Sequence, residues 1–198
     1  METNKSQQLR DGVRSAYSAA AENPQAKHPF PVGQQFAESL GYPPSLLAEL
    51  PAVAAEAFAG VSNVALFAET PEGATVLDLG CGAGLDSLIA ARRVGPRGKV
   101  IGIDFSETML ARAGQAAREA GCDNVAFHQA DAEHLFLEDN SIDIALVNGI
   151  FNLNPAREPI FSELARVVRP GGAVYGAEII LRESLPPEVQ ESETNWFA

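Results

Sequence analysis

The part of the sequence best suited to bind a ligand is the glycine-rich stretch Val76-Leu-Asp-Leu-Gly-Cys-Gly-Ala-Gly84. An apolar run leads into Gly80, Gly82 and Gly84, and helix-like sequence follows. Glycines allow the backbone to take unusual torsions and to lie directly against a ligand. Leu85 stands where the dinucleotide fingerprint G-x-G-x-x-G has its last glycine, which favours S-adenosylmethionine (SAM) over a nicotinamide dinucleotide.

Side chains with suitable chemistry also end three further apolar runs. Asp104 follows Gly80 by 24 positions, close to the roughly 20 expected for an acid that accepts hydrogen bonds from ribose hydroxyls. Asp131 is suited to accept from an adenine amino group, with the backbone N–H of Ala132 beside it, and Met109 to lie against the adenine face. A helix beginning after the glycine loop would offer its N-terminal amides to the methionine carboxylate.

Each of these residues also has an ordinary structural explanation. Asp104 is equally suited to cap a helix, Met109 to fill a core and Asp131 to form a turn. Cys81 is most simply a small apolar filler beside the ligand. The functional interpretation therefore depends on the set, because ligands of open parallel sheets bind beyond the carboxyl ends of the strands, where Asn148 is also expected.

Alternating strand and helix signals predict the elements that position these residues. We expect strands at 75–79, 99–103, 125–128, 142–147 and 173–181, and helices at 86–94, 107–120 and 157–168. This order predicts an α/β fold, Rossmann-like and doubly wound, with a mostly parallel sheet. Ser106 is the expected N-cap of the second helix.

The chain is expected to divide near residue 70. Residues 1–70 form a predicted helical cap or substrate lid, with a short helix within 1–22, an irregular segment over 23–45 that contains five prolines, and helix-like sequence over 45–67. Residues 71–198 form the predicted SAM-binding core. After Leu181 only 17 residues remain, which read as a short helix.

Composition excludes several classes of function. The net charge is −12 with no Lys/Arg cluster, which disfavours nucleic acid as a partner. No apolar run approaches 18 residues and the N-terminus is polar, so we expect no membrane partner and a cytoplasmic location. Cys81 and Cys122 lack metal-ligand spacing, so neither zinc nor a disulfide is indicated.

Together these motifs resemble class I SAM-dependent methyltransferases over residues 71–181. The segments that carry the resemblance are Val76–Gly84, Gly102-Ile-Asp104, Gln129-Ala-Asp131-Ala and Leu164-Ala-Arg-Val-Val-Arg-Pro-Gly-Gly172. Within that superfamily the chain most resembles the arsenite methyltransferase-like branch, on the runs Ala91-Arg-Arg-Val-Gly-Pro-Arg-Gly98, Asp104-Phe-Ser-Glu-Thr-Met-Leu110 and Asn148-Gly-Ile-Phe-Asn-Leu-Asn-Pro155, and upstream on Val13-Arg-Ser-Ala-Tyr17 and Gly60-Val-Ser-Asn63. The predicted cofactor-binding residues are Tyr17, Asp78, Gly80, Cys81, Gly82, Gly84, Asp104, Phe105, Met109, Asp131, Ala132 and Asn148.

The sequence departs from that branch in two respects. The arsenic enzymes bind As(III) through cysteine thiolates, and the first two positions are occupied here by Val61 and Gly149. The family also closes its sheet, in the order 3-2-1-4-5-7-6, with two strands that do not fit after Leu181. We therefore expect a C-terminally truncated core, or a short form whose fifth strand pairs with a second copy in a homodimer.

The sequence thus predicts a SAM-dependent methyltransferase that acts on a small-molecule acceptor. A non-catalytic SAM-binding module or inactive fragment is the alternative, and a nucleotide-dependent oxidoreductase is a third hypothesis. Three histidines, His28, His128 and His134, are candidate bases if the acceptor needs one. His28, in the predicted cap, is the candidate to test first; the catalytic residue itself is not identified.

Overall fold

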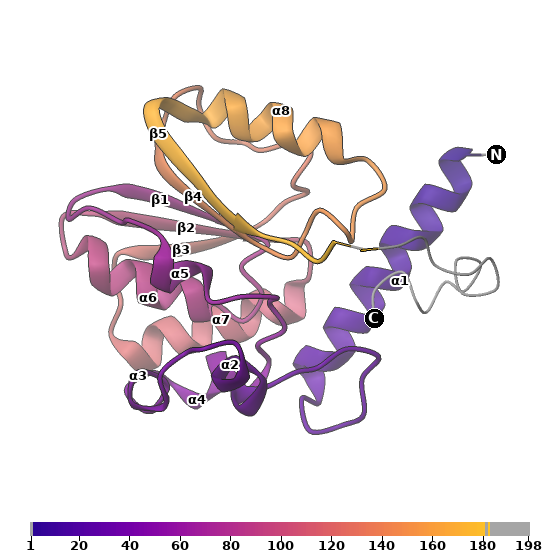
Figure 1. Ribbon diagram of the computed structural model, residues 1–198, viewed down its shortest axis with the longest axis horizontal. Helices are drawn as coiled ribbons and strands as arrows, with labels where there is room; N and C mark the ends of the chain where they lie inside the picture. The colour runs from indigo at the N-terminus through magenta and orange to yellow at the C-terminus, as the bar shows by residue number, and fades with distance from the viewer. Residues whose placement is uncertain (1, 181, 183–198) are drawn as a thin grey trace.

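A five-stranded parallel sheet forms the centre of the computed structural model, which describes residues 2–180 and 182 (Figure 1). Within those residues the strand order is β3-β2-β1-β4-β5, and every neighbouring pair is parallel. This confirms the predicted α/β, Rossmann-like fold. The strands are β1 (Thr75–Leu79), β2 (Lys99–Asp104), β3 (Val125–Gln129), β4 (Ile142–Asn148) and β5 (Val168–Ala177).

Helices cover both faces of the sheet. Helices α6 (Leu85–Val94) and α7 (Glu107–Ala120) pack on one face, and α8 (Arg157–Val167) lies on the other (Figure 1). Successive side chains of a strand point to opposite faces, so Val76 joins the core under α6, whereas Leu77 joins the core under α8. The first three strands are added toward one edge of the sheet and β4 and β5 toward the other, so the strand order reverses between β1 and β4, where ligands of such sheets bind.

The segment before β1 contains five helices. They are α1 (Glu2–Glu22), α2 (Gln34–Ser39), α3 (Pro44–Ala48), α4 (Ala52–Glu56) and α5 (Val64–Phe67). The helix-like sequence over 45–67 thus forms three short helices. Pro51 separates α3 from α4 as the N-cap of α4, and Gly60 lies in an irregular segment between α4 and α5.

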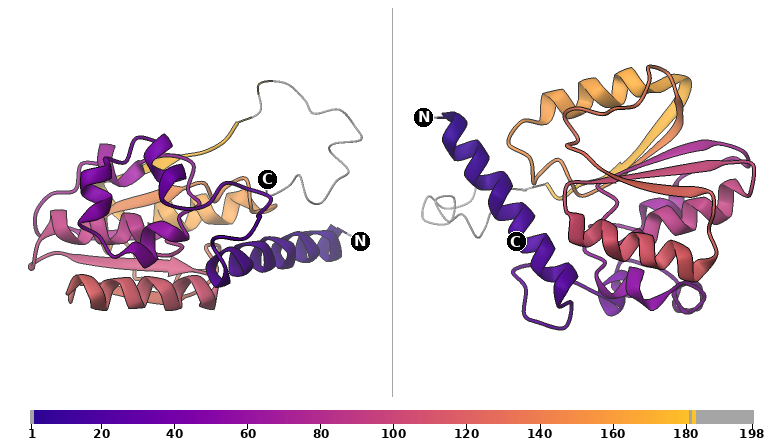
Figure 2. Two further views of the ribbon diagram at one scale, coloured as in Figure 1. Left: turned by 90° about the horizontal axis from the view of Figure 1, so that it is seen from below. Right: turned by 180° about the vertical axis from the view of Figure 1, so that it is seen from behind.

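Most of this segment shares a hydrophobic core with the sheet. Leu47 and Val64 pack in the same cluster as Val76 and Leu88. The division into a cap and a core near residue 70 stays a prediction. Helix α1 differs, because its N-terminal half extends away from the other helices (Figure 2). It packs along α7 at its C-terminal half, where Arg112 Nε donates to the carbonyl of Ala21 at 2.5 Å.

The fifth strand begins earlier than the sequence predicts. The expected strand was 173–181, but β5 starts at Val168, directly after α8. Val168 pairs with Ile142 and Ala173 with Ile144, so residues 169–172 form an irregularity within the strand instead of a separate turn. The short helix expected near the C-terminus lies outside the described residues.

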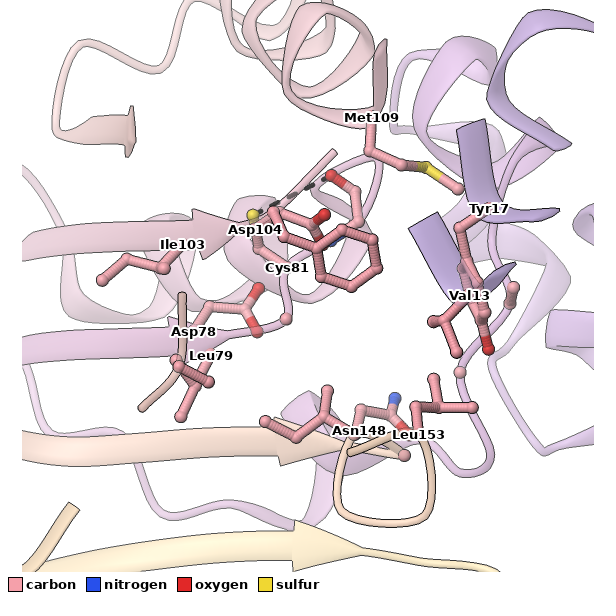
Figure 3. A pocket seen from close by; sticks show the side chains of 18 of the residues that line it. Val13, Tyr17, Asp78, Leu79, Cys81, Ile103, Asp104, Met109, Asn148 and Leu153 are labelled. Carbon is pink, nitrogen blue, oxygen red and sulfur yellow. Dashed lines mark hydrogen bonds between the residues drawn. The ribbon is translucent and has the colours of Figure 1, made fainter. Parts of the chain in front are cut away.

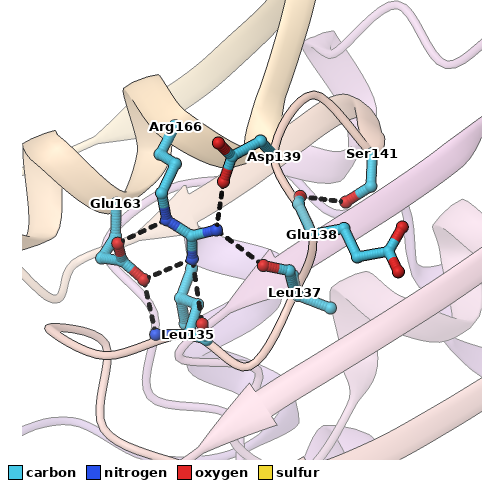
Figure 4. A network of polar contacts seen from close by, with 7 residues as sticks. All are labelled: Leu135, Leu137, Glu138, Asp139, Ser141, Glu163 and Arg166. Carbon is cyan, nitrogen blue, oxygen red and sulfur yellow. Dashed lines mark hydrogen bonds and ion pairs between the residues drawn. The ribbon is translucent and has the colours of Figure 1, made fainter.

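The connection between β3 and β4 is held against α8 by Arg166. Its guanidinium donates to both carboxylate oxygens of Glu163 at 2.7 Å and to the carbonyls of Leu135 and Leu137 at 2.9 and 2.7 Å (Figure 4). The hydrogen bonds from Arg166 lower the pKa of Glu163 to about 2. This network holds in place the non-helical segment between Asp131 and β4.

Candidate functional site

A cavity lies at the carboxyl ends of β1, β2, β3 and β4, between the sheet and α1 (Figure 3). The chain segments that enclose it come from far apart in the sequence. Eleven of the twelve residues predicted to bind the cofactor line it, which are Tyr17, Asp78, Gly80, Cys81, Gly82, Asp104, Phe105, Met109, Asp131, Ala132 and Asn148.

Gly84 is the predicted residue that does not line the cavity. It takes a left-handed conformation (φ 85°) as the N-cap of α6. A Cβ at this position would lie 3.0 Å from the Cβ of Ala113 and 3.1 Å from the ring of Phe127. Glycine is therefore required at this position by the close packing of α6 against α7 and β3.

Asp104 joins the glycine loop to the start of α7. Its carboxylate accepts from the backbone N–H of Gly82 at 2.9 Å and from that of Ser106 at 2.8 Å. Ser106 is the N-cap of α7, as predicted, and its hydroxyl accepts from the N–H of Met109. Burial raises the pKa of Asp104, while the backbone donors act in the opposite direction.

Two further carboxylates are buried at the bottom of the cavity. Asp78 on β1 is 2% exposed, and it accepts a hydrogen bond from the hydroxyl of Ser87 at 2.5 Å. Asp86, in the first turn of α6, is 5% exposed; it accepts from the hydroxyl of Tyr42 at 2.5 Å and from Nδ2 of Asn148 at 2.9 Å. Burial, followed by the charge of Asp86, raises the pKa of Asp78 to about 8. Burial also raises the pKa of Asp86.

None of these three acids has a basic partner among the side chains that the structure describes. Among residues 6–180, no lysine, arginine or histidine nitrogen lies within 4.0 Å of a carboxylate oxygen of Asp78, Asp86 or Asp104. Hydrogen bonds alone offset the loss of water around them. An ionised carboxylate is costly to bury without a counter-charge, so this part of the cavity favours a cationic ligand.

Asn148 binds the backbone of residues 60–63, which we call the strap. Its Oδ1 accepts from the N–H groups of Val61 and Ser62 at 2.9 and 3.0 Å, and its Nδ2 donates to the carbonyl of Ser62 at 2.8 Å. The strap thereby lies against the end of β4. A Cβ built on Gly149 would lie 2.8 Å from Cγ1 of Val61, so the two positions that the resemblance links to thiolates are direct neighbours.

Helix α1 closes the cavity with a row of polar contacts along one side. Arg10 forms an ion pair with Glu133 at 3.0 Å, and the hydroxyl of Ser18 lies 2.9 Å from that of Ser106. Tyr17 stacks on Phe30 at 4.4 Å between ring centroids. Burial, followed by the charge of Asp104, raises the pKa of the Tyr17 hydroxyl, so this hydroxyl stays neutral.

The residues at the end of β3 lie near the mouth of the cavity. The guanidinium of Arg14 lies 5.8 Å from the ring centroid of Phe105 and 3.8 Å from the carboxylate of Asp131. Asp131 is largely exposed. Glu133 is buried and also accepts from Nδ2 of Asn154 at 2.6 Å.

The candidate base His28 lies outside the cavity lining. Its Nε2 forms a hydrogen bond with the carbonyl of Asn23 at 2.9 Å. His128 and His134 are exposed and do not line the cavity either. Among the described residues, no group of three or more His, Cys, Asp or Glu side chains has the arrangement of a metal site.

Sequence reasoning did not identify Asp86, Tyr42, Arg10 or Glu133 as parts of the site. Asp86 carried a usable signal, because an acid two residues after the last glycine of the loop falls in the first turn of the following helix. Tyr42 carried none, since it is 44 positions from Asp86 and meets it only in the folded chain.

A family described as "Methyltransferase domain" matches residues 71–197. The chain belongs to the class I SAM-dependent methyltransferases. The arsenite methyltransferase of Halobacterium salinarum is 37% identical over 153 residues, which are 77% of this chain and 39% of that protein. The demethylmenaquinone methyltransferase of Lactococcus lactis is 38% identical over 54% of this chain and 42% of that protein.

A solved structure shows the same fold. The arsenic(III) S-adenosylmethionine methyltransferase of Chlamydomonas reinhardtii superposes with a TM-score of 0.69 and 33% identity, over 80% of this methyltransferase-family chain and 58% of that one. The chain spans about two fifths of the length of the curated relatives it matches. The cofactor of the family is SAM, and a positively charged cofactor fits the acidic lining described above.

Proposed function

We propose that this protein transfers a methyl group from SAM to a small-molecule acceptor. The observation that supports this most strongly is the cavity lined by Asp78, Asp86 and Asp104 without a basic partner among the described residues. When bound, SAM supplies a methyl group on a positively charged sulfur. A nicotinamide dinucleotide would instead bring a negatively charged pyrophosphate to these carboxylates, which disfavours the oxidoreductase hypothesis.

The lining residues have the hydrogen-bonding capacity that the cofactor needs. Each oxygen of Asp104 accepts one backbone N–H, which fixes the orientation of the carboxylate and leaves a free lone pair on each oxygen for the two ribose hydroxyls. In this proposal Asp131 and the backbone of Ala132 bind the adenine edge, and the sulfur of Met109 lies against its face. The first turn of α6 faces the methionine carboxylate.

The rest of the lining orients the acceptor and excludes water. Val13, Phe58 and Leu153 supply apolar surface around the cavity, and Tyr17 stays neutral there. No histidine lines the described cavity, and the proposal does not use His28. A cavity lining without a histidine favours an acceptor atom that attacks the methyl group through its own lone pair and needs no general base.

We further propose that the acceptor is not arsenite held by protein thiolates. As(III) is thiophilic, yet the neighbouring positions 61 and 149 are valine and glycine. Cys81 is a buried thiol of the glycine loop whose pKa is raised by burial, and Cys122 lines a groove at the opposite ends of the strands. The curated relatives named above carry different acceptors in their names, so the family does not decide the acceptor.

A turnover assay tests the proposed function. Purified protein is incubated with SAM carrying a labelled methyl group and a panel of small acceptors, together with a separate arm of arsenite plus glutathione. The proposal predicts a labelled organic product and no methylated arsenic. Methylated arsenic would contradict the assignment of the acceptor, and binding of SAM without turnover on any acceptor would favour the alternative of a non-catalytic SAM-binding module.

A second copy of the chain is the proposed protein partner. In the described part of the sheet β5 is an edge strand, and Val174 on it is about half exposed. Light scattering after size exclusion tests the homodimer, which a monomeric mass at tens of micromolar would contradict. Among the described residues no helix is both long and apolar enough to cross a membrane. The cytoplasmic location stays a prediction.

A further inference from the structure

Asp78 and Asp86 are the two most buried acids of the cavity lining, and neither forms an ion pair with a described basic side chain. Asp78 belongs to β1 and Asp86 to the first turn of α6, where the adjacent Ser87 donates to Asp78. Both side chains are more than nine-tenths buried and both line the cavity. Two ionised carboxylates at such depth repel each other, because the surroundings screen their charges poorly.

In the part of the chain that the structure describes, the other titratable groups around this pair add no positive charge. Asp104 on β2 is a third acid, and burial raises the pKa of the Cys81 thiol and of the Tyr17 and Tyr42 hydroxyls, so these three groups are neutral. Asn148 on β4 contributes an uncharged amide. The basic residues of the cavity lining are two arginines of α1, which pair with acids at the end of β3. Since the described side chains supply no cation, a proton or a cationic ligand can reduce the charge of the pair.

We propose that Asp78 and Asp86 together bind one proton while the cavity holds no cation and release it when SAM binds, so that the pair selects SAM over S-adenosylhomocysteine. This inference rests on the proposed function. During methyl transfer the acceptor's lone pair forms a bond to the methyl carbon, the carbon–sulfur bond breaks, and its electrons stay on sulfur. The sulfur is then neutral, and the acid pair takes a proton back from the solvent.

Burial raises the pKa of both acids of the pair, which favours a bound proton when the cavity holds no cation. The pKa of Asp78, raised to about 8 by burial and by the charge of Asp86, leaves the pair protonated near neutral pH. Both SAM and S-adenosylhomocysteine carry an ammonium group, and they differ in the charge on sulfur. The difference between the two ligands therefore isolates the effect of that charge.

Isothermal titration calorimetry in buffers of low and high ionisation enthalpy, phosphate and Tris, counts the protons released on binding. At pH 7 we expect wild-type protein to release close to one proton per SAM and clearly fewer per S-adenosylhomocysteine. By linkage, SAM affinity then rises by up to about tenfold per pH unit between roughly pH 6.5 and 8, and the affinity for the product rises less. Above about pH 9.5 the release disappears.

Asp86→Asn is the informative variant. The asparagine can keep both hydrogen bonds, with its carbonyl toward Asn148 and its amide toward the hydroxyl of Tyr42, which retains the carbonyl of Ser62 as its acceptor at 3.2 Å. Because the variant removes the charge of Asp86 but not the burial of Asp78, we expect it to release fewer protons at pH 7 than wild type and to show a smaller, less pH-dependent preference for SAM. Asp123→Asn, which removes an exposed carboxylate outside the cavity lining, is the matched control and should behave as wild type.

The outcomes separate this inference from the proposed function. Binding of SAM by wild-type protein with no proton release, or with equal release for both ligands, overturns the inference and leaves the function standing. Folded wild-type protein that binds neither ligand overturns both. If Asp86→Asn does not fold, the wild-type comparison of the two ligands in the two buffers decides alone.

Discussion

Replacing Tyr42 by phenylalanine tests the buried network that joins the strap to α6. Tyr42 is 1% exposed, and its hydroxyl donates to Asp86 at 2.5 Å. Phenylalanine fills the same volume, so the change removes the hydrogen bond without leaving a large cavity. The carbonyl of Ser62, the second acceptor of this hydroxyl, keeps its hydrogen bond from Asn148 at 2.8 Å, so Asp86 is the group that loses a donor.

The expected loss follows from the charge of Asp86. A hydrogen bond to a charged group contributes about 1.5–3 kcal/mol and a neutral pair about 0.5–1.5 kcal/mol. Because burial raises the pKa of Asp86, the carboxyl becomes increasingly neutral as the pH falls. Tyr42→Phe should therefore lower the free energy of unfolding by about 1.5–3 kcal/mol at pH 8 and by less at pH 5.

Urea denaturation at both pH values, followed by circular dichroism, measures this difference. Tyr175→Phe is the matched control, since Tyr175 is half-buried at the edge of the sheet against Phe67 and lies outside the network; we expect a change below about 0.5 kcal/mol. A loss for Tyr42→Phe as small as the control's at pH 8 would refute the role of this hydrogen bond. A loss that is larger at pH 5 than at pH 8 would refute the charge argument.

Two further predictions concern stability. The folded-state pKa of Asp78 is raised from an ordinary 3.8 to about 8, so the folded chain binds more protons than the unfolded chain, and without ligand the free energy of unfolding should fall as pH rises from about 4 to about 8; urea denaturation across that range would contradict this if stability rose. Gly60→Ala should destabilise by about 1–3 kcal/mol, because its Cβ would lie 2.5 Å from Nδ2 of Asn148, whereas Gly114→Ala, inside α7 and 3.4 Å from the flexible end of Arg118, should stabilise by about 0.5–1 kcal/mol. Thermal unfolding of the two alanine variants side by side checks both signs, and equal effects would contradict the packing argument.

The sheet and the glycine loop could be predicted because their signals are local. Apolar runs that end in Asp104 or Asn148 mark buried strands, and the spacing of the loop glycines indicates a ligand. The start of β5 was predicted wrongly, since residues 169–172 have the composition of a turn, and only pairing with β4 shows that the strand continues through them.

The remainder of the site depends on contacts that no local pattern encodes. Asp86 becomes part of the cavity because Tyr42 and Asn148, from distant segments, donate to it. Gly84 was predicted to bind the ligand together with the other glycines of the loop. A Cβ built on Gly84 would, however, contact side chains of α7 and β3. Spacing along the chain cannot distinguish a glycine required by a ligand from one required by packing.

Calorimetric titration of SAM into wild-type protein and into Asp104→Asn is the measurement that tests the cofactor site most directly. Asparagine cannot accept from the N–H groups of both Gly82 and Ser106 and from two ribose hydroxyls, so we expect SAM to bind wild-type protein and to bind the variant about tenfold or more weakly. Circular dichroism must show both proteins folded. No heat with SAM or S-adenosylhomocysteine on folded wild-type protein, or equal affinity in Asp104→Asn, would contradict the proposed site.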